Sequence, residues 1–329
     1  MSPKPIEVVC LRPQADFARV DALPPSSLSV RYCGPADAEV PTYLKTAHAM
    51  IIPAVGPKLP AALFEGTALK LVQVTGAGVD RIDPDAVKRH DIPVANIPGG
   101  SNNAIAEYVI SSASLLLRRL AWADAEIKAG RYTQWRAQMI AANLAGIEDA
   151  LIGIVGLGVI GLAVARLAQR SGCRVCYYDP ASPNAAAAAE LGAKSVSLDE
   201  LLSAADVVSL HVPSLPSTAG LIGARELARM KPGAVLIQAS RGGIVDEAAL
   251  AAALQSGALA GAAVDVYSTE PPPADHPLFA LEGEARNRIL FTPHIGGITR
   301  QASTFLFRTA WHNVERVLVG GQPPLYRVY

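Results

Sequence analysis

Short apolar runs alternate with helix-like segments through the first hundred residues of the chain. In chain order, the runs are Ile6–Leu11, Leu28–Cys33, Ala49–Ile52 and Leu69–Val74. Such alternation is typical of parallel strands joined by helical crossovers. We therefore expect the N-terminal part of the chain to form a parallel α/β sheet.

A long apolar segment follows the turn at Pro98–Gly100. It predicts one helix over about Asn103–Ala129, apolar on all sides and therefore buried, and then a polar, irregular arm over Gly130–Asp149. A second alternating series begins beyond the arm, and a last helix is expected over about Arg300–Val319. The strands expected in the second series are Leu151–Val155, Arg174–Tyr178, Val207–Leu210, Val235–Gln238, Ala260–Val264 and Ile289–Phe291.

The spacing of this second series fits a six-stranded doubly wound sheet that is complete without the first series. We therefore predict an α/β fold of two doubly wound parallel-sheet domains, one inserted into the other. Residues 101–297 would form the inserted Rossmann domain, including the apolar helix and the arm. Residues 1–100 and 298–329 would form a smaller, flavodoxin-like domain. A length of 329 residues agrees with two domains.

Composition narrows the class of protein. The chain has 29 basic and 29 acidic residues, so no charge excess indicates nucleic-acid binding. No apolar stretch is long enough to span a membrane, and the first residues do not resemble a signal peptide. Cys173 and Cys176 have C-x-x-C spacing, but the second pair of a structural zinc site is missing, so we expect no metal. A reducing cytoplasm is the expected location.

Gly156, Gly158 and Gly161 form a G-x-G-x-x-G motif directly after an apolar strand and at the start of a helical segment. In that setting the first glycine permits a tight turn, the second lets the backbone approach a pyrophosphate, and the third lets the helix pack on its strand. The helix N-terminus would face the phosphates with its unpaired N–H groups. The bland alternative is a glycine-rich turn without a ligand.

Asp179 ends the next predicted strand, at the distance where dinucleotide-binding domains place an acid that accepts hydrogen bonds from the adenosine ribose. The following residues, Pro180–Pro183, include no Arg or Lys that could bind a 2′-phosphate. The pattern therefore favours NAD over NADP. The alternative is an acid that only caps the next helix.

Arg241, Glu270 and His294 each lie just beyond the carboxyl end of a predicted strand, where open parallel sheets place ligand sites. Oxidation of a 2-hydroxy acid removes a hydride from C2 and a proton from its hydroxyl group. His294 is suited to exchange that proton, Glu270 to hold the imidazolium, and Arg241 to grip the substrate carboxylate. Taken singly, the same residues could be a helix cap, a solvated loop acid and a core histidine.

Nearly the whole chain resembles the D-isomer-specific 2-hydroxyacid dehydrogenase family. The segments that carry the resemblance are Gly76–Asp80, Ala106–Glu107, Gly156–Gly161, His211–Pro213, Met230–Gly233, Ser240–Glu247, Gly261–Pro271 and Thr292–Gly297. The last four are most similar to the phosphoglycerate dehydrogenase branch.

The resemblance implies an NAD-dependent enzyme with Arg241, Glu270 and His294 as its catalytic residues. It also implies that the long apolar helix and the arm form a homodimer contact. The remaining residues that it assigns are Val159, Ile160, Val212, Ala239 and Asp265 at the cofactor, the last holding the nicotinamide amide, with Ala77 and Gly78 at the substrate carboxylate. His211 is expected to form a wall of the cofactor pocket, with an acid/base role as the alternative, and His276 to be a surface or packing residue, with a substrate contact as the alternative.

Some positions depart from the family pattern. Val159 stands where a basic residue is common, and Gln238 where the strand usually ends in Asn. The arginines typical of the phosphoglycerate enzymes are missing, and only Lys58 or Arg81 could replace them. We therefore expect a small unphosphorylated substrate such as glyoxylate or hydroxypyruvate, with 3-phosphoglycerate left open. An NAD(H)-sensing corepressor on the same fold is the alternative function.

Overall fold

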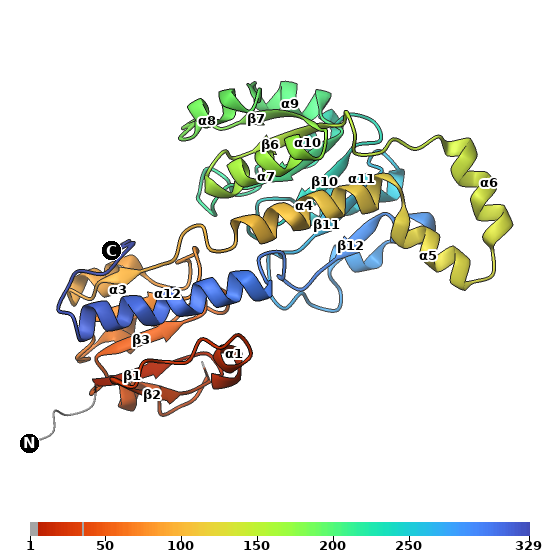
Figure 1. The fold of residues 1–329 in the computed structure, drawn as a ribbon. Coiled ribbons are helices and arrows are strands. Elements are labelled where there is room, and N and C mark those ends of the chain that lie inside the picture. Colours follow the sequence, from red (N-terminus) through yellow and green to blue (C-terminus); the bar gives the residue numbers. More distant parts are fainter. Residues whose placement is uncertain (1–5, 35) are drawn as a thin grey trace, which may run out of the picture. The chain divides into compact units, whose positions relative to one another are not determined.

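The computed structural model describes residues 6–34 and 36–329, and the chain divides into two compact units (Figure 1). Unit 1 comprises Met1–Ser101 and Ile298–Tyr329, and unit 2 comprises Asn102–Gly297. Each unit contains one sheet whose strand pairs are all parallel. The prediction of two parallel-sheet α/β domains is therefore confirmed.

The sheet of unit 1 has the strand order β2-β1-β3-β4-β5, which is the flavodoxin-like order. Its strands are β1 (Ile6–Cys10), β2 (Leu28–Tyr32), β3 (Ala49–Ile52), β4 (Leu71–Val74) and β5 (Val94–Ala95). Every residue of β3 and β4 is buried, as expected for central parallel strands covered on both faces. The helical elements of this unit are α1 (Gln14–Ala18), α2 (Val40–Leu44), η1 (Ala61–Phe64), α3 (Pro84–Arg89) and α12 (Arg300–Leu318).

The C-terminal helix α12 is fixed to the sheet of unit 1 by a buried polar residue. Asn313 is 1 % exposed, and its amide nitrogen donates to the side chain of Gln73 on β4 at 2.6 Å. The amide oxygen of Asn313 accepts from the backbone nitrogen of Leu325 at 2.7 Å. Trp311 adds a hydrogen bond to the carbonyl oxygen of Ala22. The helix therefore packs with its buried polar groups paired.

The sheet of unit 2 has seven strands in the order β12-β11-β10-β9-β6-β7-β8. They are β6 (Leu151–Val155), β7 (Arg174–Tyr178), β8 (Lys194–Ser195), β9 (Val207–Leu210), β10 (Val235–Gln238), β11 (Gly261–Val264) and β12 (Ile289–Phe291). The prediction of six strands missed β8, because two exposed polar residues at the edge of a sheet give no apolar signal. The direction of strand addition changes between β6 and β9, and such a switch point is where dinucleotides bind in this architecture.

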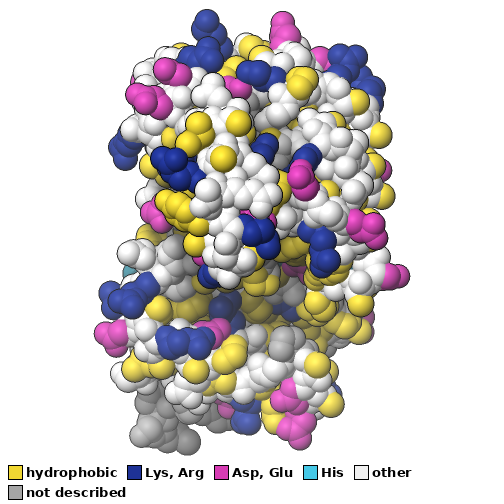
Figure 2. Space-filling model, turned by 90° about the vertical axis from the view of Figure 1, so that its right-hand side faces the viewer, with side chains coloured by type: hydrophobic (Ala, Val, Ile, Leu, Met, Phe, Trp, Pro, Cys, Tyr) yellow, Lys and Arg dark blue, Asp and Glu magenta, His cyan; other side chains and the backbone are white. Residues whose placement is uncertain are grey.

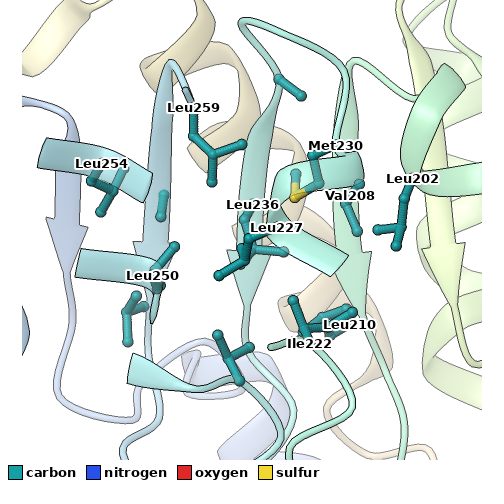
Figure 3. Close-up of a cluster of buried hydrophobic side chains, with 14 of the residues drawn as sticks. Leu202, Val208, Leu210, Ile222, Leu227, Met230, Leu236, Leu250, Leu254 and Leu259 are labelled. Carbon is teal, nitrogen blue, oxygen red and sulfur yellow. The ribbon is translucent and has the colours of Figure 1, made fainter. Parts of the chain in front are cut away.

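Helices cover both faces of this sheet. They are α4 (Asn102–Leu117), α7 (Val159–Arg170), α8 (Ala185–Glu190), α9 (Leu198–Ala204), α10 (Ala224–Arg229) and α11 (Glu247–Ser256), with the 3-10 turns η2 (Pro277–Ala280) and η3 (Gly283–Asn287). On one face, buried side chains of α9, α10 and α11 meet those of β9 and β10, among them Leu202, Leu227, Leu236 and Leu250 (Figure 3). On the other face, α4 and α7 pack against β6 and β10.

The prediction of one helix over Asn103–Ala129 is wrong. Arg119 adopts a left-handed conformation with φ of 51°, which ends α4 and starts α5 (Leu120–Lys128) in a new direction. The arm is also more regular than expected, since it contains α6 (Tyr132–Ala142). Trp122 of α5 packs on Trp135 of α6 with ring centroids 4.8 Å apart. These two helices project from the body of unit 2 (Figure 1).

Among the described residues, none of the helices has the length and apolar character that a membrane span needs.

The buried amide of Asn313 provides a test of the packing of α12. We expect Asn313→Ala to lower the free energy of unfolding of unit 1 by about 2–3 kcal/mol, because it leaves the backbone N–H of Leu325 and Oε1 of Gln73 without their hydrogen bonds to Asn313. Urea unfolding followed by fluorescence measures this change. His312→Ala, at an exposed position of the same helix, is the control. Equal stability of the two variants would contradict the proposed anchoring role.

Candidate active site

The glycine loop of unit 2 joins β6 to α7 at the switch point of the sheet. Gly156 has φ of 95°, and a Cβ atom there would lie 2.7 Å from the carbonyl oxygen of His211, so only glycine fits. A Cβ at Gly161 would lie 2.1 Å from the carbonyl oxygen of Gly156. A Cβ at Gly158 would meet no atom of the described chain within 4 Å. The loop is therefore close-packed behind and open at Gly158, as a pyrophosphate cradle at the N-terminus of α7 requires.

Asp179 follows β7 and supports the glycine loop. Its Oδ2 accepts from the backbone nitrogen of Leu157 at 2.6 Å, while Oδ1 accepts from the nitrogens of Ala181 and Ser182 at 2.8 and 2.9 Å. These three donors occupy most of the lone-pair sites of a carboxylate. They also hold its negative charge fixed beside the loop. No basic side chain occurs over Pro180–Pro183.

His294 and Glu270 form the pair that the sequence predicted. Nδ1 of His294 lies 3.0 and 2.9 Å from the two carboxylate oxygens of Glu270. Both side chains are partly exposed, at 24 % and 29 %. The backbone nitrogen of Tyr267 donates to Oε1 of Glu270 at 3.1 Å, which orients the carboxylate. A carboxylate on one ring nitrogen fixes the ring, and Nε2 makes no hydrogen bond within the part of the chain described here.

Asp265, at the end of β11, shapes the loop that carries His294. Its carboxylate is buried and accepts from Thr292 Oγ1 at 2.6 Å and from the backbone nitrogens of Ile295 and Gly296, both at 2.8 Å. The carbonyl oxygen of Asp265 accepts from the backbone nitrogen of His294 at 2.8 Å. His294 itself has φ of 55°, a strained value for a residue with a Cβ atom. The hydrogen bonds of Asp265 hold this conformation.

Arg241 lies in the loop after β10. Gln238 is buried at the end of that strand, and its side chain donates to the carbonyl oxygen of Arg241 at 2.9 Å. Gly242 packs so closely on the next loop that a Cβ atom there would lie 1.8 Å from the carbonyl oxygen of Tyr267. The loops after β10, β11 and β12 are thus packed or hydrogen-bonded to one another along one edge of the sheet. They carry Arg241, Glu270 and His294 respectively.

Three further predicted residues lie at the same edge. Val212 follows β9, and one of its methyl groups would lie 2.9 Å from a Cβ atom at Gly156. Ala239 directly follows β10 and is partly exposed. His211 bonds to Ser209 Oγ through Nε2 at 2.8 Å, and burial lowers the pKa of His211 to about 4. A ring with that pKa is neutral near pH 7, which fits a pocket wall better than a proton donor.

Val159 and Ile160 form the first turn of α7. Val159 is 53 % exposed, so the position where the family commonly has a basic residue is apolar and open to solvent.

Ala77 and Gly78 belong to unit 1, in the loop after β4 at the carboxyl edge of its sheet. Asn96 donates to the carbonyl oxygen of Ala77 at 2.6 Å and so supports the loop. Arg81 is 3 % exposed and donates to the carbonyl oxygens of Pro53 and Pro57 at 3.0 and 2.9 Å. Lys58 is exposed. Arg81, one of the two cations considered as binding groups for a phosphate, therefore holds the loop that contains Pro53 and Pro57.

Taken together, a glycine loop at the switch point and an imidazole–carboxylate pair at the neighbouring strand ends define an α/β domain that binds a dinucleotide. The family model described as "D-isomer specific 2-hydroxyacid dehydrogenase, NAD binding domain" matches residues 110–296. The chain therefore belongs to the D-isomer-specific 2-hydroxyacid dehydrogenases, a family of NAD-dependent oxidoreductases. Unit 2 contains its NAD-binding domain, so the predicted family and cofactor are confirmed.

Curated relatives and solved structures agree with this family. The chain is 36 % identical to D-3-phosphoglycerate dehydrogenase of Mycobacterium leprae over 87 % of this chain and 52 % of the relative. It is 39 % identical to (S)-sulfolactate dehydrogenase of Chromohalobacter salexigens over 76 % of each chain. The crystal structure of protein TT0316 from Thermus thermophilus superposes with a TM-score of 0.83 at 31 % identity, covering 98 % of this chain and 100 % of that one. The chain spans about half the length of the phosphoglycerate dehydrogenases that it matches.

Sequence reasoning did not foresee the residues that support the site from behind. Gln238 was noted only as a departure from the family pattern, yet it holds the loop of Arg241. Thr292 and Tyr108 were not considered, although Tyr108 on α4 bonds to Thr292, which in turn donates to Asp265. Gly242 could have been suspected, because two glycines directly follow Arg241 and glycine often marks a close backbone approach.

The fixed charge of Asp179 leads to a prediction about the cofactor. We expect kcat/KM with NADH to exceed that with NADPH by at least about tenfold, roughly 1.4 kcal/mol, because the carboxylate repels a 2′-phosphate. Replacing Asp179 with Ser and Pro180 with Arg should narrow this preference. Asp179→Asn, which removes the charge and one accepting oxygen but adds no basic group, is the matched control and should narrow the preference in part. Equal kcat/KM for both cofactors in the unmodified protein would show that the argument from charge is wrong.

Proposed function

We propose that this chain is an NAD-dependent dehydrogenase that transfers a hydride between the nicotinamide and C2 of a small 2-hydroxy or 2-keto acid. The observation that carries the proposal is the contact of Nδ1 of His294 with Glu270 at 2.9 Å. A histidine held by a carboxylate on one nitrogen is suited to exchange a proton through the other. The C2 oxygen of the substrate is the group that must gain or lose that proton.

The side chains divide the work as the chemistry requires. A nicotinamide cofactor bound at the glycine loop would supply the hydride in the reductive direction and accept it in the oxidative direction. In the reductive direction, His294 gives a proton to the C2 oxygen as the hydride reaches C2, and Glu270 stabilises the imidazolium before this transfer. Arg241 binds the substrate carboxylate in a two-pronged contact. By the family resemblance, the backbone N–H groups of Ala77 and Gly78 in unit 1 would bind a substrate carboxylate, and unit 1 would be the substrate domain.

Asp265 has a second role in this proposal. Its carboxylate would accept a hydrogen bond from the nicotinamide amide besides the three that it accepts within the protein. Val212 and Ala239 would line the same cofactor site. These assignments derive from the family resemblance, and the position of each residue at the carboxyl edge of the sheet supports them.

We also propose a homodimer formed through α4, α5 and α6. The projecting helices α5 and α6 expose large apolar side chains, which are costly to leave in water: Leu120 is 42 %, Ile127 45 %, Tyr132 60 % and Ile140 62 % exposed. Figure 2 views the molecule from the side to which the arm projects and shows apolar side chains among the charged ones. A cytoplasmic location, expected from the cysteines, remains a prediction.

For the substrate, we propose an unphosphorylated 2-keto acid such as glyoxylate or hydroxypyruvate. Binding a phosphate group needs concentrated positive charge, usually from arginine. Arg81 is buried, and its Nε and Nη1 donate to two backbone carbonyl groups, which leaves only Nη2 unpaired among the described residues and so offers no two-pronged contact to a phosphate. Lys58 is one exposed point charge on a flexible stem. No observation on the described residues favours the alternative of an NAD(H)-sensing regulator.

The role of His294 is tested by substitution. We expect His294→Asn to lower kcat at least about a hundredfold, the usual scale of general acid–base catalysis, while NADH still binds. Steady-state kinetics and a fluorescence titration with NADH measure the two quantities. His312→Asn, an exposed histidine of unit 1, is the control and should keep full activity. Near-normal turnover by His294→Asn would exclude it as the proton donor.

The substrate is tested by comparing kcat/KM for hydroxypyruvate, 3-phosphohydroxypyruvate and 3-sulfopyruvate with NADH. Because two of the three guanidinium nitrogens of Arg81 already bond to backbone carbonyl groups, we expect hydroxypyruvate, with its uncharged C3 substituent, to be preferred. A preference above about tenfold for either charged compound, roughly 1.4 kcal/mol of transition-state binding, would reject the hypothesis.

A further inference from the structure

A second carboxylate–imidazole pair lies behind the first, and the reaction described above does not use it. Nε2 of His276 lies 3.0 Å from Oε2 of Glu247. Unlike His294 and Glu270, these side chains are almost withdrawn from solvent, at 3 % and 13 % exposure. Buried ionisable groups are costly unless they are paired, so a pair of this kind needs a physical reason.

The contacts of Glu247 indicate what the pair does. Glu247 is the first residue of α11, and its carboxylate accepts two hydrogen bonds from Ser268, one from the backbone nitrogen at 2.7 Å and one from Oγ at 2.5 Å. Ser268 is the residue after Tyr267, whose backbone nitrogen donates to Glu270 at 3.1 Å. Glu247 is therefore hydrogen-bonded to the turn that carries Glu270, the partner of His294.

His276 lies against Glu247 on its other side. Nδ1 of His276 accepts a hydrogen bond from the backbone nitrogen of Leu278 at 3.4 Å, and Nε2 is close to the Glu247 carboxylate without completing a hydrogen bond to any described residue. The ring packs edge-on against Tyr267 and tilted against Phe279, with centroids 5.8 and 5.3 Å away. Its position is therefore fixed by packing on the same turn that Glu247 grips.

The turn is also held from a third direction. The hydroxyl of Tyr267 donates to the carbonyl oxygens of Val264 and Thr292, and Gly242 packs on the backbone of Tyr267 and Ser268. These contacts set where the turn lies. Ser268 donates both its backbone N–H and its hydroxyl group to the carboxylate of Glu247. Among the contacts described for the turn, no other joins two donors of one residue to a carboxylate. Charge-assisted bonds are the stronger class, so this contact should decide how firmly the turn is held.

We propose that Glu247 and His276 are positioning residues, which hold the Tyr267–Glu270 turn so that the carboxylate of Glu270 stays on Nδ1 of His294. This inference rests on the proposed function, because it assigns a role within that reaction. The simpler alternative is that Glu247 only stabilises the N-terminus of α11. The two readings differ in one respect, namely whether an effect of Glu247 on turnover depends on Glu270.

The experiment is a double-mutant cycle of Glu247→Gln and Glu270→Gln, with kcat and the KM for NADH measured for each variant. Gln keeps the shape of Glu247 but loses its charge and one acceptor. We expect Glu247→Gln to lower kcat about tenfold and to leave the KM for NADH within about twofold, since the glycine loop lies at other strand ends. In the Glu270→Gln background, the same substitution should change kcat less than about twofold.

Glu226→Gln is the matched control. Glu226 is also a buried carboxylate in the first turn of a helix, α10, where it accepts from Gly223 and pairs with Arg225, and it has no contact with Ser268. We expect it to keep the kcat of the unmodified protein. An unchanged kcat in Glu247→Gln would overturn the proposal. So would an equal fold-loss of kcat from Glu247→Gln in the unmodified and the Glu270→Gln backgrounds, because that result indicates a purely structural role.

Two further measurements keep the proposal testable. If Glu247→Gln does not fold, Ser268→Ala removes one of the two bonds without burying a new polar group, and the same dependence of the kcat loss on Glu270 should appear with a smaller loss.

If the unmodified protein reduces no 2-keto acid, the proposed function fails. The restraint of the turn by Glu247 is then measured as the rate of amide hydrogen exchange of residues 266–270. This rate should be faster in Glu247→Gln than in Glu226→Gln. Equal exchange would reject it.

Discussion

Asp265 is a buried carboxylate at the end of β11, and it must be hydrogen-bonded because a bare charge there would be too costly. Its partners all come from the loop after β12: the hydroxyl of Thr292 and the backbone nitrogens of Ile295 and Gly296. The backbone nitrogen of Asp265 donates to Gln238 on β10. One residue thus ties three adjacent strand ends together. The left-handed conformation of His294, and hence its contact with Glu270, depends on this arrangement.

The proposed site divides into groups that would meet the reactants and groups that hold those in place. His294, Glu270 and Arg241 lie on three neighbouring loops, and each loop forms hydrogen bonds with a polar side chain that is buried or nearly so. Gln238 secures the loop of Arg241, Asp265 that of His294, and Glu247 that of Glu270. Irregular loops can therefore place side chains accurately, because their backbone polar groups are paired with groups anchored on strands and helices.

The sequence predicted the strands well where they are long and buried. Central parallel strands such as β9 and β10 are covered on both faces, and they appear as unbroken apolar runs. The short edge strands β5 and β8 were missed because two residues give no periodic signal. The break at Arg119 was missed because neither glycine nor proline marks it, and a residue with a Cβ atom seldom adopts a left-handed conformation.

The same limit applies to the site. The residue types at the strand ends, together with the family resemblance, identified Arg241, Glu270 and His294 as candidates. The pairing of Glu247 with Ser268 joins residues 21 positions apart, and that of Tyr108 with Thr292 joins residues 184 apart. Contacts of this kind follow from the folded arrangement of the strands and cannot be read from spacing along the chain.

In the proposed reaction, a hydride passes directly between the nicotinamide of NAD and C2 of a 2-keto acid. The most direct measurement uses NADH labelled with deuterium at C4, in separate reactions for each face of the ring, with a panel of 2-keto acids. The product is then examined by mass spectrometry and chiral chromatography. We predict a D-2-hydroxy acid that carries deuterium at C2 from one of the two labelled forms. Absence of deuterium at C2 with both forms and every keto acid would contradict it.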